Sequence, residues 1–189
     1  MRNFALASVM LCALVGCNRD SAKEGAPSKE GANGVAQTDA DPLVGKPAPD
    51  FTAKAQTGAE VHLAALKGKP VVVYFYPKDE TSGCTAEANA FRDTWSDLQK
   101  KDVVLIGVSG DTDESHRAFA DNHKLPFLLV SDPDGKIAAK FGVPFKGGYA
   151  SRQSFVIGPD GNVTKVYRAV DVTAHAKQIG DDVTAAKKP

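Results

Sequence analysis

Cys84 is the residue in this chain whose surroundings point most clearly to chemistry. The segment Pro77-Lys-Asp-Glu-Thr81-Ser-Gly-Cys84 follows a continuous apolar run, Val71 to Tyr76, and precedes a stretch with helical periodicity. Cys84 is therefore predicted in the first turn of a helix, directly after a strand. Unpaired backbone N–H groups and the helix dipole favour an anion at that position, so the thiol is expected to ionise more easily than a free thiol. Its thiolate would be a nucleophile.

The elements that must position Cys84 follow from the spacing of apolar residues. A helix is predicted over 84–100, because one stripe at helical spacing contains Cys84, Ala88, Phe91, Trp95 and Leu98. Buried strands are predicted at 71–76, 103–109 and 127–131, and a hairpin at 154–157 and 163–167. Other helices are predicted from an Asp111/Glu114 cap to about Asn122, before Phe141, and from about Asp171. This order predicts an α/β, thioredoxin-like fold with a central mixed sheet flanked by helices.

Composition limits the classes of function. The chain has 189 residues, which fits one domain with appendages. Lys and Arg together number 23, as do Asp and Glu, and no basic patch stands out. A nucleic-acid partner is therefore not expected.

The first 16 residues have the pattern of a signal peptide. Arg2 supplies the positive charge, and the apolar stretch from Phe4 to Gly16 is shorter than the roughly 20 residues that a membrane-spanning helix needs. Leu14-Val-Gly-Cys17 resembles the bacterial lipobox, which implies cleavage before Cys17 and attachment of lipid to its sulfur. A buried N-terminal helix and an ordinary secreted protein are the alternatives.

Residues 17–41 are predicted to be a disordered tether, and residues 42–189 the folded domain. The tether is rich in Gly, Ala, Ser, Lys and Glu and has no aromatic residue, so it cannot bury enough surface to fold. The chain has three cysteines, Cys12, Cys17 and Cys84. Processing would remove the first and acylate the second, so Cys84 would remain as the free thiol and no disulfide could form within the mature domain.

The motif around Cys84 resembles a known family. Pro77-x-x-x-Thr81-x-x-Cys84 matches the peroxiredoxin motif, and three flanking segments match in order: Val44–Phe51, Phe75–Asp79 and Arg152–Ile157. The order and spacing are similar to those of the bacterioferritin-comigratory, or Q-type, peroxiredoxins of the AhpC/TSA family. The resemblance covers essentially all of residues 42–189.

The resemblance implies a role for each residue of the motif. Cys84 would be the peroxidatic nucleophile, which forms a sulfenic acid. The Thr81 hydroxyl would reach the sulfur and the peroxide, and Arg152 would hold the thiolate and polarise the O–O bond. Pro77 would limit solvent access and shape the pocket. Structural readings also exist, in which Cys84 is a small buried hydrophobe, Thr81 a helix cap, Arg152 a surface arginine and Pro77 the end of a strand.

The chain departs from many Q-type members at Asn89. Those members carry a second, resolving cysteine at this position, five residues after the first. The departure predicts a one-cysteine mechanism, in which an external thiol reduces the sulfenic acid. That thiol would belong to a thioredoxin-like protein or to a low-molecular-weight compound. If Cys17 were not acylated, the tether is long enough to bring it to Cys84.

The function expected from this resemblance is a peroxidase that needs no metal, haem or flavin. It would reduce hydrogen peroxide, with organic hydroperoxides as a further substrate class, and perform antioxidant defence as a monomer or dimer. It would be lipid-anchored in a bacterial cell envelope and face the periplasm. A thiol–disulfide oxidoreductase is disfavoured, because Thr81 replaces the first cysteine of a Cys-x-x-Cys pair. A non-catalytic thioredoxin-like binding module is the other alternative.

Glu87 is expected in the first helical turn. The four histidines show no metal-ligand spacing and are expected to be ordinary surface or helix residues: His62, His116, His123 and His175.

Overall fold

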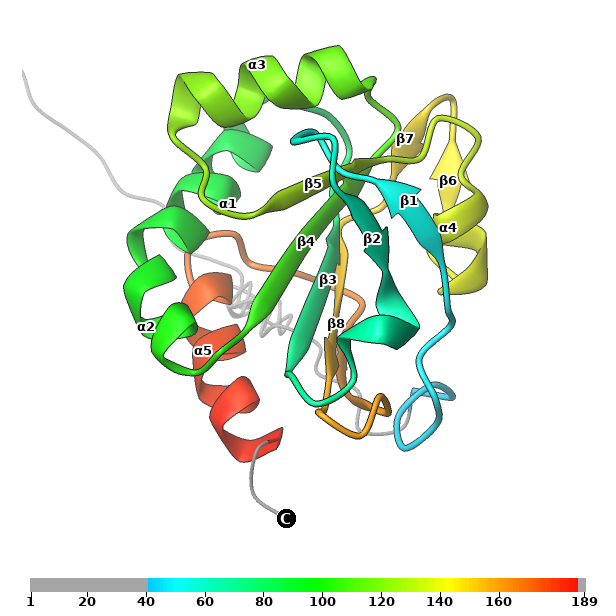
Figure 1. Cartoon of the computed structure of the whole chain (residues 1–189). Coiled ribbons are helices and arrows are strands. Elements are labelled where there is room, and N and C mark those ends of the chain that lie inside the picture. The colour runs from blue at the N-terminus through cyan, green and yellow to red at the C-terminus, as the bar shows by residue number, and fades with distance from the viewer. Residues whose placement is uncertain (1–40, 187–189) are drawn as a thin grey trace, which may run out of the picture. The chain divides into compact units, whose positions relative to one another are not determined.

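The computed structural model describes residues 41–186, which fold around a five-stranded sheet (Figure 1). The strands lie in the order β5, β4, β3, β8 and β9. Their bounds are β3 Val71–Phe75, β4 Val104–Ser109, β5 Leu128–Ser131, β8 Gln153–Ile157 and β9 Val163–Tyr167. Strands β3, β4 and β5 are parallel, whereas β8 is antiparallel to both β3 and β9. The predicted mixed sheet is therefore confirmed.

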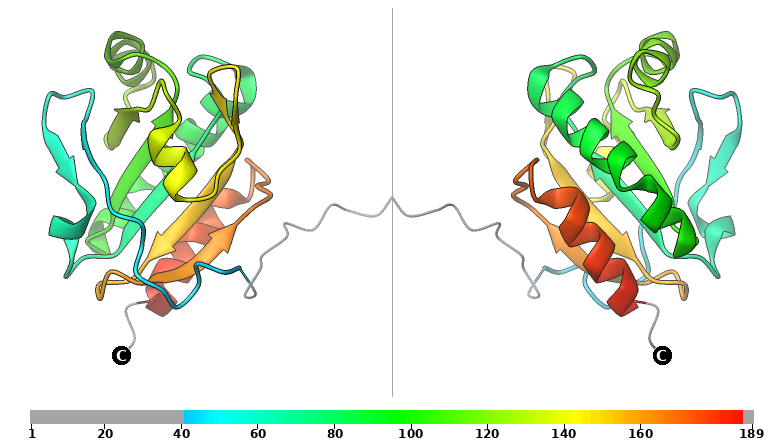
Figure 2. Two further views of the ribbon diagram at one scale, coloured as in Figure 1. Left: turned by 90° about the vertical axis from the view of Figure 1, so that its right-hand side faces the viewer. Right: turned by 90° about the vertical axis from the view of Figure 1, so that its left-hand side faces the viewer.

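Both faces of the sheet are covered (Figure 2). One face packs against four helices: α1 Ser82–Asp93, α2 Trp95–Lys100, α3 Asp113–His123 and α5 His175–Ala186. The other face packs against β1 Thr52–Lys54, β2 Glu60–His62, the 3₁₀ helix η1 Leu63–Leu66 and α4 Lys136–Lys140. A two-stranded ribbon, β6 Phe145–Lys146 and β7 Tyr149–Ala150, precedes β8.

Strand β3 shows why the sequence forms two hydrophobic layers. All five of its side chains are buried, as expected for a central strand with no polar face. Successive side chains point to opposite faces of a sheet. Val71, Val73 and Phe75 therefore join the core beside α4, while Val72 and Tyr74 join the core beside α1.

The single helix predicted over 84–100 is wrong in its bounds. Helix α1 begins earlier, at Ser82, and the helical path is interrupted at Thr94 between α1 and α2. The Thr94 hydroxyl donates to the carbonyl of Ala90 at 3.0 Å and to that of Phe91 at 3.2 Å. Such back-bonding by a threonine side chain competes with the regular helical pattern, which explains the break.

Two predicted helix starts are also corrected. Thr112, not Asp111, caps α3, because its hydroxyl accepts a hydrogen bond from the N–H of Ser115 at 3.3 Å. The last helix begins at His175, not near Asp171. The Asp171 carboxylate accepts hydrogen bonds from the backbone and hydroxyl of Thr173, which holds a turn before the helix.

The predicted signal peptide 1–16, with Cys12 as well as Cys17, lies outside the described residues, as does the tether up to residue 40. Asp41, the last residue assigned to the tether, forms an ion pair with Arg168 on the domain, with Nε and Oδ2 2.7 Å apart. Asp41 therefore belongs with the folded domain rather than with the tether. Among residues 41–186, none of the helices has the length and apolar character needed to cross a membrane.

Candidate active site

Cys84 lies where the chain passes from β3 into α1. The N–H of Tyr76 donates to the carbonyl of Val108 at 3.1 Å and continues the pairing of β3 with its neighbour β4. Pro77 follows, half-buried and without an N–H to donate, so the pairing ends there. Cys84 occupies the first turn of α1 and is 2% exposed. This is the position expected from the sequence.

Arg152 is brought to Cys84 by the register of the sheet. Phe75, the last residue of β3, pairs with Gln153, the first residue of β8, so Arg152 lies beside the end of β3. Its Nη2 donates to Cys84 Sγ at 3.2 Å. A Cβ atom at Gly83 would lie 3.4 Å from the same nitrogen, an ordinary van der Waals contact, so the guanidinium lies directly beside the start of the helix. Because the guanidinium side chain is only 19% exposed, Arg152 is not a surface arginine.

Glu87 is a site residue that the sequence interpretation placed wrongly. It lies in the second turn of α1, 1% exposed, and its Oε2 accepts a hydrogen bond from Nη1 of Arg152. Residues three apart on a helix share a face, so the spacing from Cys84 to Glu87 was the signal available in the sequence. Burial raises the pKa of Glu87 to about 7, although the charge and hydrogen bond of Arg152 act in the opposite direction.

The Thr81 side chain lies at the start of α1 but does not cap it. Thr81 has extended backbone angles of φ −75° and ψ 147°, and its carbonyl accepts the first helical hydrogen bond, from the N–H of Thr85 at 2.8 Å. Its hydroxyl donates to the carbonyl of Lys78 at 3.0 Å. A hydroxyl has one proton and two lone pairs, so this oxygen remains free to accept a hydrogen bond.

Two of the four histidines, one on α3 and one on α5, are fully buried, although a helix position is within the expectation of surface or helix residues. His116 and His175 are both 0% exposed. His175 Nε2 lies 2.8 Å from the hydroxyl oxygen of Ser154 on β8. Burial, with a smaller contribution from the charge of Arg152, lowers the pKa of His175 to about 4, so the ring is neutral near pH 7. His62 and His123 lie toward solvent, paired with Asp50 and Glu80 respectively.

Cys84 is the one cysteine within residues 41–186, and its thiol is unpaired. Asn89, the position of the absent second cysteine, accepts a hydrogen bond from Arg92 at 2.9 Å on the same helix. No group of three or more His, Cys, Asp or Glu side chains in this part of the chain could hold a metal ion. The described site is therefore a single thiol between a helix N-terminus and an arginine.

Comparisons with known proteins agree on one family. The family model described as "AhpC/TSA family" matches residues 44–166. Peroxiredoxin Q of Sedum lineare is 48% identical over 125 residues, which are 65% of this chain and 67% of that protein. A chloroplastic peroxiredoxin Q of Gentiana triflora is 48% identical over 121 residues, but the match spans only 56% of its length. A protein of Coxiella burnetii named "Putative peroxiredoxin bcp" is 40% identical over 145 residues, which are 72% of this chain and 95% of that protein.

Solved structures lead to the same fold. The crystal structure of peroxidoxin BcpB from Mycobacterium tuberculosis matches with a TM-score of 0.71 and 32% identity, covering 77% of this chain and 99% of that one. The bacterioferritin comigratory protein of Xanthomonas campestris, which has alkyl peroxide reduction activity, matches with a TM-score of 0.68 and 32% identity over 72% of this chain and 92% of that one. The predicted thioredoxin-like fold is thus confirmed.

Proposed function

Because the chain belongs to the AhpC/TSA family, we propose that it is a thiol-dependent peroxidase that acts through Cys84. The observation that carries this proposal is the contact between Arg152 Nη2 and Cys84 Sγ, 3.2 Å apart in the first turn of α1. A guanidinium and a helix N-terminus both favour the thiolate form of a cysteine. The substrates proposed are hydrogen peroxide and organic hydroperoxides.

In the proposed first step, the Cys84 thiolate attacks one oxygen of the peroxide. An S–O bond forms as the O–O bond breaks, and the leaving oxygen takes a proton and departs as water or an alcohol. Cys84 becomes a sulfenic acid while the peroxide is reduced. Arg152 stabilises the negative charge that moves from sulfur to the leaving oxygen. The free lone pairs of Thr81 accept a hydrogen bond from the peroxide O–H, and Pro77 excludes water from one side.

The second step needs a thiol from outside the described domain. An external thiol attacks the sulfenic sulfur, forms a mixed disulfide with Cys84 and releases water. A second thiol then attacks that disulfide, which returns Cys84 to the thiol and leaves the external pair oxidised. Asn89 in place of a second cysteine supports this one-cysteine route. The reductant proposed is a thioredoxin-like protein or a low-molecular-weight thiol.

Stopped-flow fluorescence tests the function. Trp95 is the one tryptophan of the chain and packs against the hydrophobic cluster that contains Cys84, so its fluorescence is the probe chosen. The reduced full chain is mixed with one equivalent of hydrogen peroxide, and sulfenic acid at Cys84 is trapped in parallel. We expect oxidation at least about 100-fold faster than that of free glutathione, because one positioned donor to a developing anion contributes about 10²–10³-fold. The variant Cys84→Ser should give no fast phase. A rate no higher than that of glutathione would instead favour a non-catalytic binding module.

The proposed location is the cell envelope. In this proposal, residues 1–16 are removed, Cys17 carries lipid, residues 17–41 form the tether and residues 42–189 form the peroxidase domain. The support is the lipobox-like Leu14-Val-Gly-Cys17 sequence. The intact mass of protein extracted from membranes tests it. A mature chain that begins at Cys17 with an acyl adduct is expected, and an unmodified Cys17 would refute the lipid anchor.

A further inference from the structure

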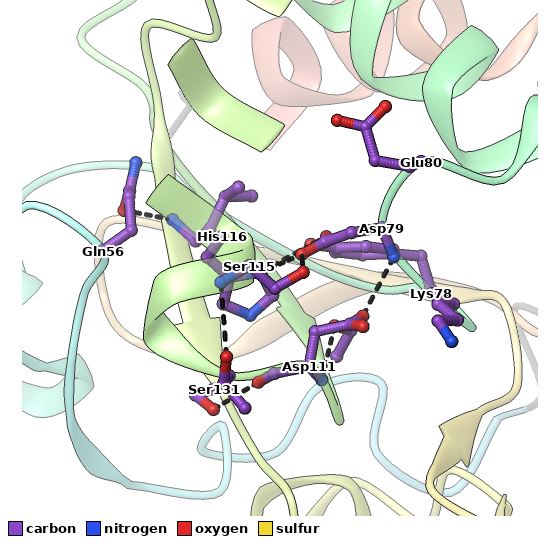
Figure 3. A network of polar contacts seen from close by, with 12 residues as sticks. Gln56, Lys78, Asp79, Glu80, Asp111, Ser115, His116 and Ser131 are labelled. Atoms are coloured by element: carbon purple, nitrogen blue, oxygen red, sulfur yellow. Dashed lines mark hydrogen bonds and ion pairs between the residues drawn. The ribbon is translucent and has the colours of Figure 1, made fainter. Parts of the chain in front are cut away.

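The loop between Pro77 and Thr81 turns two carboxylates toward helix α3. Asp79 Oδ2 lies 2.9 Å from His116 Nδ1 and accepts a hydrogen bond from the Ser115 hydroxyl at 2.7 Å (Figure 3). Glu80 Oε2 lies 2.9 Å from His123 Nε2 at the end of the same helix. The loop that leads into the active site is therefore attached to α3 by two carboxylate–histidine pairs.

The two pairs differ sharply in their exposure to water. The side chains of His116 and Asp79 are 0% and 2% exposed, and the Tyr76 hydroxyl donates to the second carboxylate oxygen, Oδ1, at 2.7 Å. Burial alone would favour the neutral acid, but the hydrogen bond and charge of His116, followed by Ser115 and Tyr76, lower the pKa of Asp79. The side chains of His123 and Glu80 are 22% and 50% exposed, so solvent screens their attraction.

One peptide group joins the buried pair to Thr81. The carbonyl of Lys78 accepts the hydrogen bond of the Thr81 hydroxyl at 3.0 Å, and the N–H of Asp79 donates to Asp111 Oδ2 at 2.9 Å. These two groups are opposite ends of the same planar peptide bond. A rotation of the loop at Asp79 would therefore redirect the Thr81 hydroxyl.

The loop also needs support from outside itself. Glu80 has a φ of 60°, in the left-handed region that side-chain-bearing residues rarely adopt. Such a backbone persists only where the surrounding structure holds it. Asp111, which anchors the loop backbone, is itself held by the Ser109 hydroxyl at 2.7 Å and by the Ser131 hydroxyl on its carbonyl (Figure 3).

We propose that Asp79 and His116 are positioning residues for the peroxidase reaction. Their buried pair locks the peptide between Lys78 and Asp79, and that peptide sets the direction of the Thr81 hydroxyl that receives the peroxide. This inference rests on the proposed peroxidase function. It assigns to α3, which carries none of the motif residues, a part in orienting the substrate.

The test compares two reactions of Cys84 in the full chain. Oxidation by hydrogen peroxide needs the positioned hydroxyl of Thr81, whereas alkylation by iodoacetamide needs the thiolate and access to its sulfur but not that hydroxyl. The rate of the first is followed by Trp95 fluorescence and that of the second by mass spectrometry of the Cys84 peptide. We expect Asp79→Asn to slow oxidation about 10- to 100-fold, because small misplacements of catalytic groups have effects of this size. Alkylation should keep the rate of the unaltered chain.

The matched control is Glu80→Gln, which makes the same chemical change one residue away at the exposed pair. It should leave both reactions close to those of the unaltered chain. If Asp79→Asn fails to fold, judged by circular dichroism, Ser115→Ala removes one hydrogen bond from the same carboxylate and should slow oxidation alone by a few-fold.

Three outcomes would overturn the proposal: unchanged oxidation in Asp79→Asn, an equal loss in both reactions, or the same loss in Glu80→Gln. Slow oxidation of the unaltered chain would refute the peroxidase function itself, so the two failures are distinguishable.

Discussion

The two faces of the central sheet are built from different kinds of side chain. Beside α4, the aromatic side chains are phenylalanines, and the ring of Phe155 lies 4.9 Å from that of Phe141 and 5.8 Å from that of Phe75. Beside α1, three tyrosines are buried together with four ionisable side chains: Asp79, Glu87, His116 and His175. The α4 side also holds a buried carboxylate, that of Asp132, which accepts hydrogen bonds from the N–H groups of Ile137 and Ala138 in α4. The α1 side is the richer of the two in buried ionisable groups.

This difference separates the side chains that stabilise the fold from those that affect the reactivity of Cys84. Apolar packing is insensitive to pH, whereas each buried ionisable group makes the fold or the reaction depend on protonation. Cys84, Arg152 and Glu87 all meet on the α1 side, at the end of β3. We expect substitutions on the α4 side to change stability alone, and substitutions on the α1 side to change reactivity or pH dependence.

The largest effect on stability is expected from Phe155→Ala. Removing a fully buried phenylalanine leaves a cavity and typically costs about 3–5 kcal/mol in the free energy of unfolding. The side chain faces away from Cys84, so the oxidation rate measured while the protein is folded should remain close to that of the unaltered chain. Urea unfolding and stopped-flow oxidation measure the two quantities separately. A slower oxidation rate in the folded variant would show that the two faces are not independent.

The largest effect on reactivity is expected from Arg152→Met. This variant removes the donor to Cys84 Sγ, and we expect peroxide oxidation to slow about 10²–10³-fold. Arg152→Lys keeps a positive charge but cannot bond Glu87 and Cys84 with a planar fork, so an intermediate rate is expected. The measurement is the second-order rate constant with hydrogen peroxide. An unchanged rate in Arg152→Met would remove arginine from the proposed mechanism.

The strands and the nucleophile could be predicted from the sequence because their patterns are local. Five apolar residues in a row define β3, and the Cys84 motif spans only eight positions. The short strands β1, β2, β6 and β7 have two or three residues each and carry too little pattern to be recognised. Thr94 breaks the predicted helix by a side-chain hydrogen bond that apolar spacing does not report.

The buried polar partners could not be predicted because they depend on distant contacts. Glu87 is 65 positions from Arg152, and Asp79 is 37 positions from His116. Charged residues are usually taken to face water. Spacing places Glu87 on the helix face of Cys84, but only the tertiary arrangement shows its partner Arg152 and the burial of Asp79 against His116. Arg152 entered the candidate site through family resemblance, while the register of β3 with β8 supplies the physical reason.

His175 should make stability depend on pH. Its pKa is lowered from 6.5 to about 4, so its contribution to stability is present above pH 6.5 and is lost as the pH falls toward 4. At about 1.4 kcal/mol per pKa unit, the loss amounts to about 3 kcal/mol at most. Glu87 acts in the opposite sense, because its raised pKa gives a contribution that is present below pH 4.5 and lost as the pH rises through about 7.

The test therefore compares the free energy of unfolding of the unaltered chain with that of His175→Gln. Glutamine cannot titrate but can still hydrogen-bond the Ser154 hydroxyl. Urea unfolding at a series of pH values should show the unaltered chain losing stability relative to the variant between pH 6.5 and about 4. A constant difference across that range would mean that His175 does not titrate on unfolding.

The smallest effect is expected from Glu87→Gln, and it concerns the pH profile of oxidation. Glu87 accepts a hydrogen bond from the Arg152 guanidinium. The pKa of Glu87 is raised to about 7, so this carboxyl group ionises near neutral pH. A charge-assisted hydrogen bond is stronger than a neutral one, so the ionised form orients Arg152 better. Glutamine offers only the neutral contact. We expect the variant to match the unaltered chain well below pH 7 and to be a few-fold slower well above it.

The rate constant with hydrogen peroxide, measured across pH, decides this prediction. The unaltered chain should show an inflection near pH 7 that Glu87→Gln lacks. Glu80→Gln, which alters an exposed carboxylate on the adjoining loop, should keep the inflection. If the inflection persisted in Glu87→Gln, another group would titrate there. Glu87 would then be a buried partner of Arg152 without influence on its reactivity.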